Sequence, residues 1–384
     1  MYDVIVVGAG PAGSTAARYT AMSGLRTMLI EKERFPRIKP CAGGVSRYAL
    51  ENLGIELPPS LIEKRIKGAR VWYKNSYMES MNDEEVAVTV QRDRFDKFLA
   101  DQASRAGANF LDNTPVKGID IDSDCATVHT EQGSYCAKMI IGADGMNGVC
   151  ARNVRSPYGK EEVAFSMEAE IPVNDDFLDD NLSSMVQFHF GDVPRGYGWV
   201  FPKKDRICVG IGEIGPDWNR PVDSYRRFLN KLGMDYVKPR GYMLPVGGHT
   251  RNTYNDRILL TGDSAGLVDA FLGEGIAYAI MSGKLAAETA ACAHKSNNYS
   301  SYSLSTYHRR CQREFGSDLK YSLLLSRIFY KNPDIFASML IRHPSLLDRF
   351  VLLATPDFNY GSYLKWLIPR LPFYVAKELI SSKV

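Results

Sequence analysis

The opening stretch of the chain, Tyr2–Gly13, constrains the fold more than any other part of the sequence. Its β-branched run Val4–Val7 predicts a parallel strand that is buried on both faces. Gly8 allows the tight turn that follows, Gly10 lets the backbone approach a pyrophosphate, and Gly13 lets the next helix pack against the strand. A helix that begins at this turn offers its free N–H groups to phosphate oxygens. The stretch therefore predicts a dinucleotide-binding unit.

Three further strands end in an acidic residue, which is typical of the ligand-facing edge of a nucleotide-binding sheet. The strand Arg26–Ile30 ends in Glu31, about 20 residues after the glycines, where a carboxylate binds the adenosine ribose hydroxyls. A later buried strand ends in Gly-Ala-Asp-Gly at Asp144, and another ends in Gly-Asp at Asp263. The glycine turns lie far apart in the sequence, so we expect one sheet assembled from three chain segments. A ligand that all of them touch must be long, which favours FAD over NAD.

Strand-rich inserts separate these turns and divide the chain into three regions. Alternating apolar residues predict strands within 68–90 and 163–248, whereas the residues after Gly275 are typical of helices with breaks at prolines. We expect a helix over Val45–Leu53, another from Gly275 to about Cys292, and a polar linker over Asn297–Ser303. The expected fold class is α/β (α+β overall), with a Rossmann-like FAD-binding domain (1–67, 91–160 and 249–296), an inserted antiparallel-sheet substrate domain (68–90 and 161–248) and a C-terminal helical region (297–384).

Composition excludes several classes of protein. The chain has 384 residues, of which 45% are hydrophobic and 24% charged, as in ordinary globular enzymes. A net charge of +3 is too small to indicate a nucleic-acid partner. The seven cysteines are scattered without a CxxC pair, which indicates a reducing compartment and predicts no metal site. We expect a cytoplasmic protein, because the first strand leaves no room for a signal peptide and no apolar run approaches the ~18 residues of a membrane span.

The C-terminal segment Tyr363–Lys377 leaves peripheral membrane contact open. It mixes aromatic residues, leucines and cations, a composition that suits an anchor at a membrane interface. The same composition suits a terminal helix that packs on the core. Peripheral contact with the inner face of the membrane is therefore kept as one of two alternatives.

Three aromatic residues share one face of a predicted hairpin strand. Tyr197, Trp199 and Phe201 alternate along this strand, and the turn Lys203–Arg206 returns the chain into a second strand. Aromatic residues in such a row either fill the core of the sheet or form one wall of an apolar cavity.

The three glycine turns resemble the FAD motifs of flavin-dependent oxidoreductases that share the fold of aromatic-ring hydroxylases. Over most of residues 1–295, the chain is most similar within that superfamily to the geranylgeranyl reductase family. The resemblance is carried by Pro40–Gly44, by Tyr197–Pro202 with the trailing Gly210–Gly212, and by Gly273–Ile276. It implies FAD as cofactor and a long isoprenoid lipid as substrate, with isolated C=C bonds reduced as in archaeal lipids, the (bacterio)chlorophyll tail or menaquinone side chains. Ala42 departs from the pattern, because many members have glycine directly after the cysteine.

Reduction of an isolated alkene needs a hydride from reduced FAD, a proton source and a dry apolar cavity. The resemblance implies that Cys41, Tyr197 and Trp199 are catalytic. Cys41 either donates the proton or positions the flavin, and a small buried hydrophobe is the alternative reading of this cysteine. The implied substrate-binding residues are Gly44, Tyr197, Trp199 and Phe201. The implied cofactor-binding residues are Gly8, Gly10, Ala12, Gly13, Glu31, Cys41, Ala42, Gly43, Arg92, Asp144, Asp263, Gly273, Gly275 and Ile276.

Two other functions are compatible with the same fold. A monooxygenase or halogenase lets oxygen reach the reduced flavin, so its NAD(P)H oxidation consumes oxygen. A membrane-associated electron-transfer flavoprotein passes electrons to quinone, but relatives of that kind carry a C-terminal cysteine cluster, and this chain has no cysteine after Cys311. The electron donor stays open between ferredoxin, a reduced flavin and NAD(P)H, because no second GxGxxG motif stands between a predicted strand and a helix; the GxGxxG spacing of Gly210–Gly215 begins inside the predicted hairpin strand.

Overall fold

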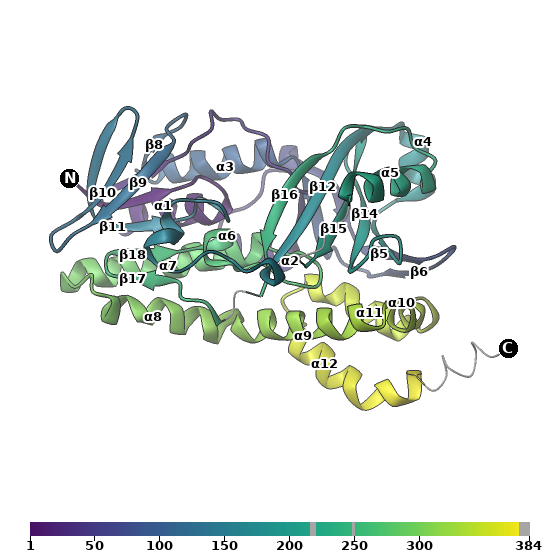
Figure 1. Cartoon of the computed structure of the whole chain (residues 1–384). Helices are drawn as coiled ribbons and strands as arrows, with labels where there is room; N and C mark the ends of the chain where they lie inside the picture. Colours follow the sequence, from purple (N-terminus) through teal and green to yellow (C-terminus); the bar gives the residue numbers. More distant parts are fainter. Residues whose placement is uncertain (216–219, 248–249, 376–384) are drawn as a thin grey trace.

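Two large β-sheets lie side by side along the length of the molecule, and long helices run beneath both of them (Figure 1). The structure is a computed structural model that describes residues 1–215, 220–247 and 250–375. It confirms the expected fold class: a Rossmann-like sheet with helices, an inserted second sheet and a C-terminal helical region. The exact division of the chain into three domains stays a prediction.

The first sheet has the strand order β17-β18-β11-β1-β2-β8, with β10 and β9 added beside β11. The pairs β1–β11, β1–β2, β11–β18 and β2–β8 are parallel. The glycine turns after β1, β11 and β18 therefore lie together at one edge, as the sequence predicts. The strands are β1 (Tyr2–Val7), β2 (Thr27–Ile30), β8 (Asn109–Leu111), β9 (Val116–Ile121), β10 (Ala126–Thr130), β11 (Gly133–Gly142), β17 (Tyr254–Asn255) and β18 (Ile258–Leu260).

Helices cover the first sheet and begin at its glycine turns. Helix α1 starts with Pro11 at its first position, where the missing N–H costs nothing. It crosses α7 so closely that a Cβ on Gly283 would lie 2.3 Å from the Ala12 carbonyl oxygen. The helices of this part are α1 (Pro11–Met22), α2 (Arg47–Leu53), α3 (Arg92–Arg105), α6 (Gly262–Ala265) and α7 (Ile276–Ser296).

The second sheet has the order β16-β12-β15-β14-β13-β5-β6 and is antiparallel except for one pair. The exception is β13 with β5, which run parallel in the sheet that the sequence predicts as antiparallel. A third, small sheet joins β3, β7 and β4. The strands are β3 (Gly44–Ser46), β4 (Ile62–Ile66), β5 (Gly68–Tyr73), β6 (Ser76–Met81), β7 (Ala87–Val90), β12 (Val163–Pro172), β13 (Met185–Phe190), β14 (Gly196–Pro202), β15 (Arg206–Ile214) and β16 (Arg240–Pro245), with α4 (Asp175–Asn181) and α5 (Pro221–Lys231) beside them.

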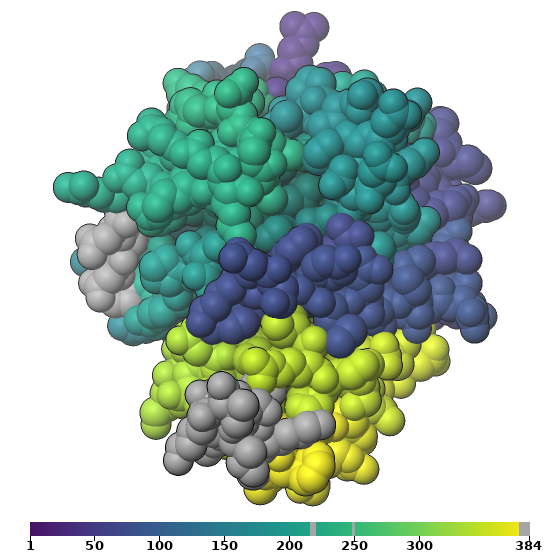
Figure 2. Space-filling model, turned by 90° about the vertical axis from the view of Figure 1, so that its right-hand side faces the viewer, coloured from purple at the N-terminus to yellow at the C-terminus, as the bar shows by residue number. Residues whose placement is uncertain are grey.

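The C-terminal helices form a layer under both sheets. Helix α8 (Ser301–Cys311) passes through one π-helical turn (Gln312–Gly316) into α9 (Ser317–Lys331), and the three segments run on in line (Figure 1). Helices α10 (Pro333–Arg342) and α11 (Pro344–Val351) pack against β5 and β6. Figure 2 shows this contact as the blue segment that lies across the yellow-green helices. Helix α12 (Tyr360–Leu367) follows, and short 3-10 turns lie at Pro59–Leu61, Cys150–Asn153, Lys160–Glu162, Leu352–Ala354 and Ile368–Arg370.

Three predicted boundaries are wrong, and the first has a clear local cause. The helix expected from Val45 begins at Arg47, because Val45 pairs with Val88 in β3 and the Ser46 hydroxyl accepts the N–H of Ala49 as the cap. Helix α7 continues to Ser296, beyond Cys292. The linker expected over Asn297–Ser303 is shorter, because α8 starts at Ser301. The breaks expected at Pro333 and Pro344 are confirmed, because one helix ends just before each proline and the next begins at it.

Some predictions include residues outside the described ones. Residues 216–219 and 248 belong to the predicted strand-rich region, residue 249 begins the last part of the predicted FAD-binding domain, and residues 376–384 belong to the predicted C-terminal helical region. The last two residues of the segment Tyr363–Lys377 are among them. None of the described helices combines the length and the apolar content needed to cross a bilayer.

The Trp199 side chain lies flat on the second sheet because its neighbour on β15 has no side chain. Trp199 pairs with Gly210, and a Cβ on Gly210 would lie 2.2 Å from the indole Cζ2. A glycine at this register position is therefore required by close packing rather than by backbone conformation.

We expect Gly210→Ala to lower the free energy of unfolding by about 1–3 kcal/mol, because the methyl group must push the indole off the sheet. Gly118→Ala is the matched control, since Gly118 also lies in a strand and no atom is found within 4 Å of its would-be Cβ. Urea denaturation of both variants measures the difference. Equal losses in the two variants would contradict this explanation of Gly210.

Candidate active site

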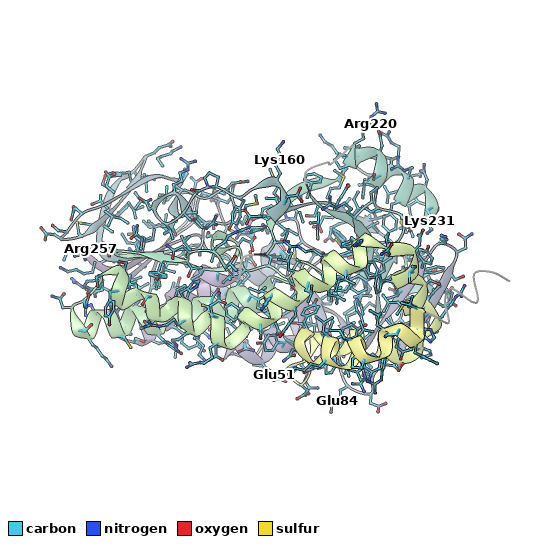
Figure 3. All side chains as sticks on the ribbon, turned by 60° about the horizontal axis from the view of Figure 1, so that its bottom comes forward. Glu51, Glu84, Lys160, Arg220, Lys231 and Arg257 are labelled. Carbon is cyan, nitrogen blue, oxygen red and sulfur yellow. The ribbon has the colours of Figure 1, made fainter. Side chains whose placement is uncertain are left out.

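One continuous cavity of about 770 Å³ extends from the glycine turns of the first sheet to the inner face of the second sheet. The C-terminal helices close it from below through Phe350, Val351 and Tyr360. Charged side chains outside this cavity, such as Glu51, Lys160 and Arg220, lie at the periphery of the molecule and point outward (Figure 3). Among the described residues, no cluster of His, Cys, Asp and Glu is arranged to hold a metal ion.

The first glycine turn is shaped by its neighbours in the sheet. Gly8 has φ +99°, and a Cβ there would lie 2.3 Å from the carbonyl oxygen of Ala143 in the second turn. Glu31 is buried at the end of β2 and accepts the Ala9 N–H at 2.8 Å through Oε2. Its Oε1 accepts the Glu33 N–H at 3.1 Å. The acid that the sequence assigns to a ribose thus also fixes the turn itself.

The second and third turns are joined by their acids. Asp144 accepts the Ser264 hydroxyl at 2.9 Å through Oδ1 and the Cys150 N–H at 3.0 Å through Oδ2. Both carboxylate oxygens of Asp144 therefore accept hydrogen bonds from the chain itself, although the residue lines the cavity. Asp263 accepts the hydroxyl of Tyr242 at 3.2 Å, which ties the third turn to β16 of the second sheet.

A fourth turn, residues 269–275, leads into α7 and is built around a buried acid. Asp269 is fully buried and accepts the N–H groups of Phe271 at 2.7 Å and Leu272 at 3.1 Å, and the hydroxyl of Tyr360 at 2.6 Å. Burial raises the pKa of this carboxyl group. The turn presents Gly273 and Gly275 to the cavity directly before the first residue of α7. The dipole of α7 at this point suits a ligand with partial negative charge.

Cys41 lies at the junction between the glycine turns and the second sheet. Its N–H donates a hydrogen bond to Glu168, and burial raises the pKa of that glutamic acid. The Gly43 N–H donates to the Cys41 sulfur at 3.4 Å. The Arg92 guanidinium interacts with the same side chain and is held by Asp96 through two hydrogen bonds of 2.9 Å. The thiol therefore has a cation and an N–H beside it.

The second sheet and the C-terminal helices provide the apolar part of the cavity. Tyr197, Trp199 and Phe201 all line it, as expected for the wall alternative. The Tyr197 hydroxyl donates to the Leu272 carbonyl oxygen, so it connects this wall to the turn before α7. Beyond them the cavity continues into what we call the apolar arm, which is formed by buried side chains. The apolar arm consists of Val86, Val88, Val186, Phe188, Phe271 and Phe350.

The structure brings together most of the predicted site residues. Gly8, Gly10, Ala12, Glu31, Cys41, Ala42, Gly44, Arg92, Asp144, Tyr197, Trp199, Phe201, Asp263, Gly273, Gly275 and Ile276 line the cavity. Gly13 and Gly43 do not line it, because a Cβ on them would meet the Gly8 oxygen at 1.8 Å and the Val90 oxygen at 2.1 Å. These two glycines serve close packing of the chain on itself.

Sequence reasoning missed several polar residues that line the cavity, among them Arg37, Lys39, Glu168 and Tyr242. Arg37 and Lys39 lie in the proline-rich loop after β2, where the cations themselves were a usable signal. Glu168 and Tyr242 lie on strands of the second sheet and belong to no motif, so the sequence carried no signal for them.

The residues at the glycine turns fit FAD. The turns leave no side chain between the backbone and a ligand, and Gly10 has only the tip of Arg37 near its would-be Cβ, at 3.7 Å. The Nζ atom of Lys39 is buried without a hydrogen-bond partner. A buried cation that lines the same cavity as the glycine turns suits the negative charge of a pyrophosphate.

Comparisons with known proteins agree with this geometry. Residues 1–199 match the family model of the FAD binding domain. The chain is thus a flavoprotein of the FAD-binding class, and it binds FAD. It is 32% identical over 354 residues to a digeranylgeranylglycerophospholipid reductase of Methanococcus vannielii, which covers 85% of this chain and 87% of that protein. A reductase of the same name from Thermoplasma volcanium is 34% identical over 344 residues, with coverages of 82% and 84%.

Among solved structures, a geranylgeranyl bacteriochlorophyll reductase-like protein of Thermoplasma acidophilum has a TM-score of 0.81 at 28% identity, covering 99% of this chain and 98% of that one. The chain belongs to the geranylgeranyl reductase family and is an FAD-dependent oxidoreductase. A flavin-dependent brominase is similar at a TM-score of 0.72 but only 18% identity, which shows a shared fold.

We expect Tyr360→Phe to lower the free energy of unfolding by about 1–3 kcal/mol, because buried Asp269 loses its hydroxyl donor. Tyr302→Phe is the control, since Tyr302 is 85% exposed. Urea denaturation measures both variants. If Tyr360→Phe unfolds like the control, the hydrogen bond does not hold the C-terminal helices to the turn before α7.

Proposed function

We propose that this protein saturates isolated C=C bonds in a long isoprenoid chain of the geranylgeranyl type, carried by a lipid or quinone headgroup. The observation that carries the proposal is that one cavity runs from the glycine turns past Cys41 into the apolar arm. A branched hydrocarbon chain in this arm gains about 25 cal/mol for each Å² removed from water. The names of the two relatives described above support the same substrate class.

The residues around Cys41 supply what an unpolarised alkene lacks. When bound and reduced, FAD provides the hydride. The second carbon must then take up a proton, and we assign that proton to the Cys41 thiol. The Arg92 guanidinium and the Gly43 N–H stabilise the thiolate that remains, which regains its proton from solvent before the next turnover.

The aromatic wall places the chain and keeps water out. Tyr197 is fixed by its hydrogen bond to Leu272, and Trp199 is fixed on the sheet by the missing side chain of Gly210. A Cβ on Gly44 would lie 2.9 Å from the Phe201 ring, so Gly44 leaves room for this ring beside the substrate. We therefore assign these residues to substrate binding, and the valine and phenylalanine side chains of the apolar arm to the exclusion of water.

We also propose that the C-terminal helices contact a membrane surface, from which the substrate enters. Residues 301–375 carry ten Lys and Arg against five Asp and Glu. Ile368 and Phe373 are 56% and 68% exposed. The Arg370 guanidinium lies over the Trp366 ring, 5.1 Å from its centroid. Exposed apolar side chains among cations are typical of segments that lie at an interface with anionic lipid.

An anaerobic assay tests the proposed reaction. Incubation with a geranylgeranyl lipid and dithionite is expected to add two hydrogens per reduced double bond, as measured by mass spectrometry. Cys41→Ala should lower kcat roughly 100-fold or more while FAD stays bound, because it removes a proton donor. Cys292→Ser is the control, since Cys292 is exposed. Oxygen consumption coupled to substrate turnover, with no hydrogen added, would support a monooxygenase or halogenase instead.

Vesicle co-sedimentation tests the membrane contact. The double variant Ile368→Asp and Phe373→Asp is expected to reduce binding to anionic vesicles roughly tenfold or more, because two apolar side chains no longer enter the interface. Met22→Asp serves as the control, since Met22 is 65% exposed at the end of α1 and lies outside the C-terminal helices. Unchanged binding of the double variant would remove this surface from the proposal while leaving the reductase assay unaffected.

A further inference from the structure

Lys39 is a buried cation without a hydrogen-bond partner. Its Nζ lies inside the cavity, over the ring of Tyr242. A lysine in such a place is costly unless an anion joins it. The loop that carries it is fixed on both sides: Arg37 pairs with Asp96 at 3.0 Å, and Cys41 is bound by Glu168.

The charged groups of the chain do not satisfy Lys39. Asp263 from α6 and Asp96 from α3 attract it, Arg92 from α3 repels it, and the thiol of Cys41 lies on its own loop. Asp96 is already bound by Arg92 and Arg37. Asp263 is shared with the Tyr242 hydroxyl from β16. The Lys39 Nζ is therefore left without a hydrogen-bond partner at the position where the third glycine turn meets the second sheet.

We propose that Lys39 binds the pyrophosphate of FAD and that FAD binding fixes the positive charge on this lysine. The pyrophosphate is the part of FAD that carries permanent negative charge, and the glycine turns beside Asp263 are the part of the cavity that suits it. The proposal concerns the cofactor alone and stands whether or not the substrate is an isoprenoid.

A pH dependence follows from the environment of Lys39. Burial lowers its pKa to about 8 in the protein without FAD. The pyrophosphate favours the charged form and raises this pKa in the complex. FAD affinity is then full below pH 8 and falls as pH rises above 8, by up to roughly tenfold per pH unit, until the pKa of the complex is passed. Over the same range, FAD binding takes up a proton.

Titration of the full-length protein with FAD and with ADP tests the proposal. ADP carries the pyrophosphate but no isoalloxazine. At pH 7, Lys39→Met is expected to weaken both ligands roughly tenfold to hundredfold and to abolish the pH dependence above pH 8. Lys39→Arg should restore affinity and keep it constant through pH 9.5, because guanidinium stays charged. Lys32→Met is the matched control: Lys32 lines the same cavity but is exposed, and less than threefold loss is expected.

Two results would overturn the proposal. If Lys39→Met weakens FAD but not ADP, the lysine serves the isoalloxazine end of the cofactor. If it weakens neither, Lys39 has no part in binding. Calorimetry of the unmodified protein at pH 8.5, in buffers of different ionisation enthalpy, needs no variant to fold, and the absence of proton uptake there would equally reject the assignment.

Discussion

Parallel pairing of β1 with β11, and of β11 with β18, is the constraint on which the rest of the structure depends. Parallel strands end at the same edge of a sheet, so this pairing brings three glycine turns from distant parts of the chain to one place. The acids at the strand ends then bind backbone and side-chain donors of neighbouring turns, as Glu31 does with Ala9 and Asp144 with Ser264. Hydrogen bonds within the chain therefore hold the turns of the ligand-binding edge together without a ligand.

The two ends of the cavity differ in their electrostatics, and Cys41 lies between them. On the side of the glycine turns, buried charges are numerous and several are paired, as Arg37 is with Glu31 and Asp96, whereas the Lys39 Nζ has no hydrogen-bond partner. On the other side, the apolar arm is made of valine and phenylalanine. Low polarity strengthens the interactions of the few charged groups at its border, Arg92 among them. A hydride acceptor with no polarity of its own needs this combination of a dry site and a nearby proton.

The glycine motifs made the first sheet predictable, because each motif imposes the same strand, turn and helix wherever it occurs. The aromatic row at Tyr197, Trp199 and Phe201 was predictable as one face of a strand, but not as a cavity wall. Contacts across the sheets were not predictable: Tyr242 reaches Asp263, and Tyr360 reaches Asp269, only because the second sheet and the C-terminal helices fold over the first. Val45 likewise follows its partner strand rather than the helical pattern of the residues after it.

The unbroken helical path from Ser301 to Lys331 limits how far the molecule can open for a large substrate. At about 1.5 Å per residue, this path is roughly 46 Å long, which is enough to support both sheets from one side. Moving the two sheets apart would require this helical path to bend at its π-helical turn, Gln312–Gly316. Enzymes that clamp onto their substrates depend on such a movement. A flexible hydrocarbon chain can enter a rigid cavity end first. A molecule braced in this way therefore favours substrates that have a free chain end.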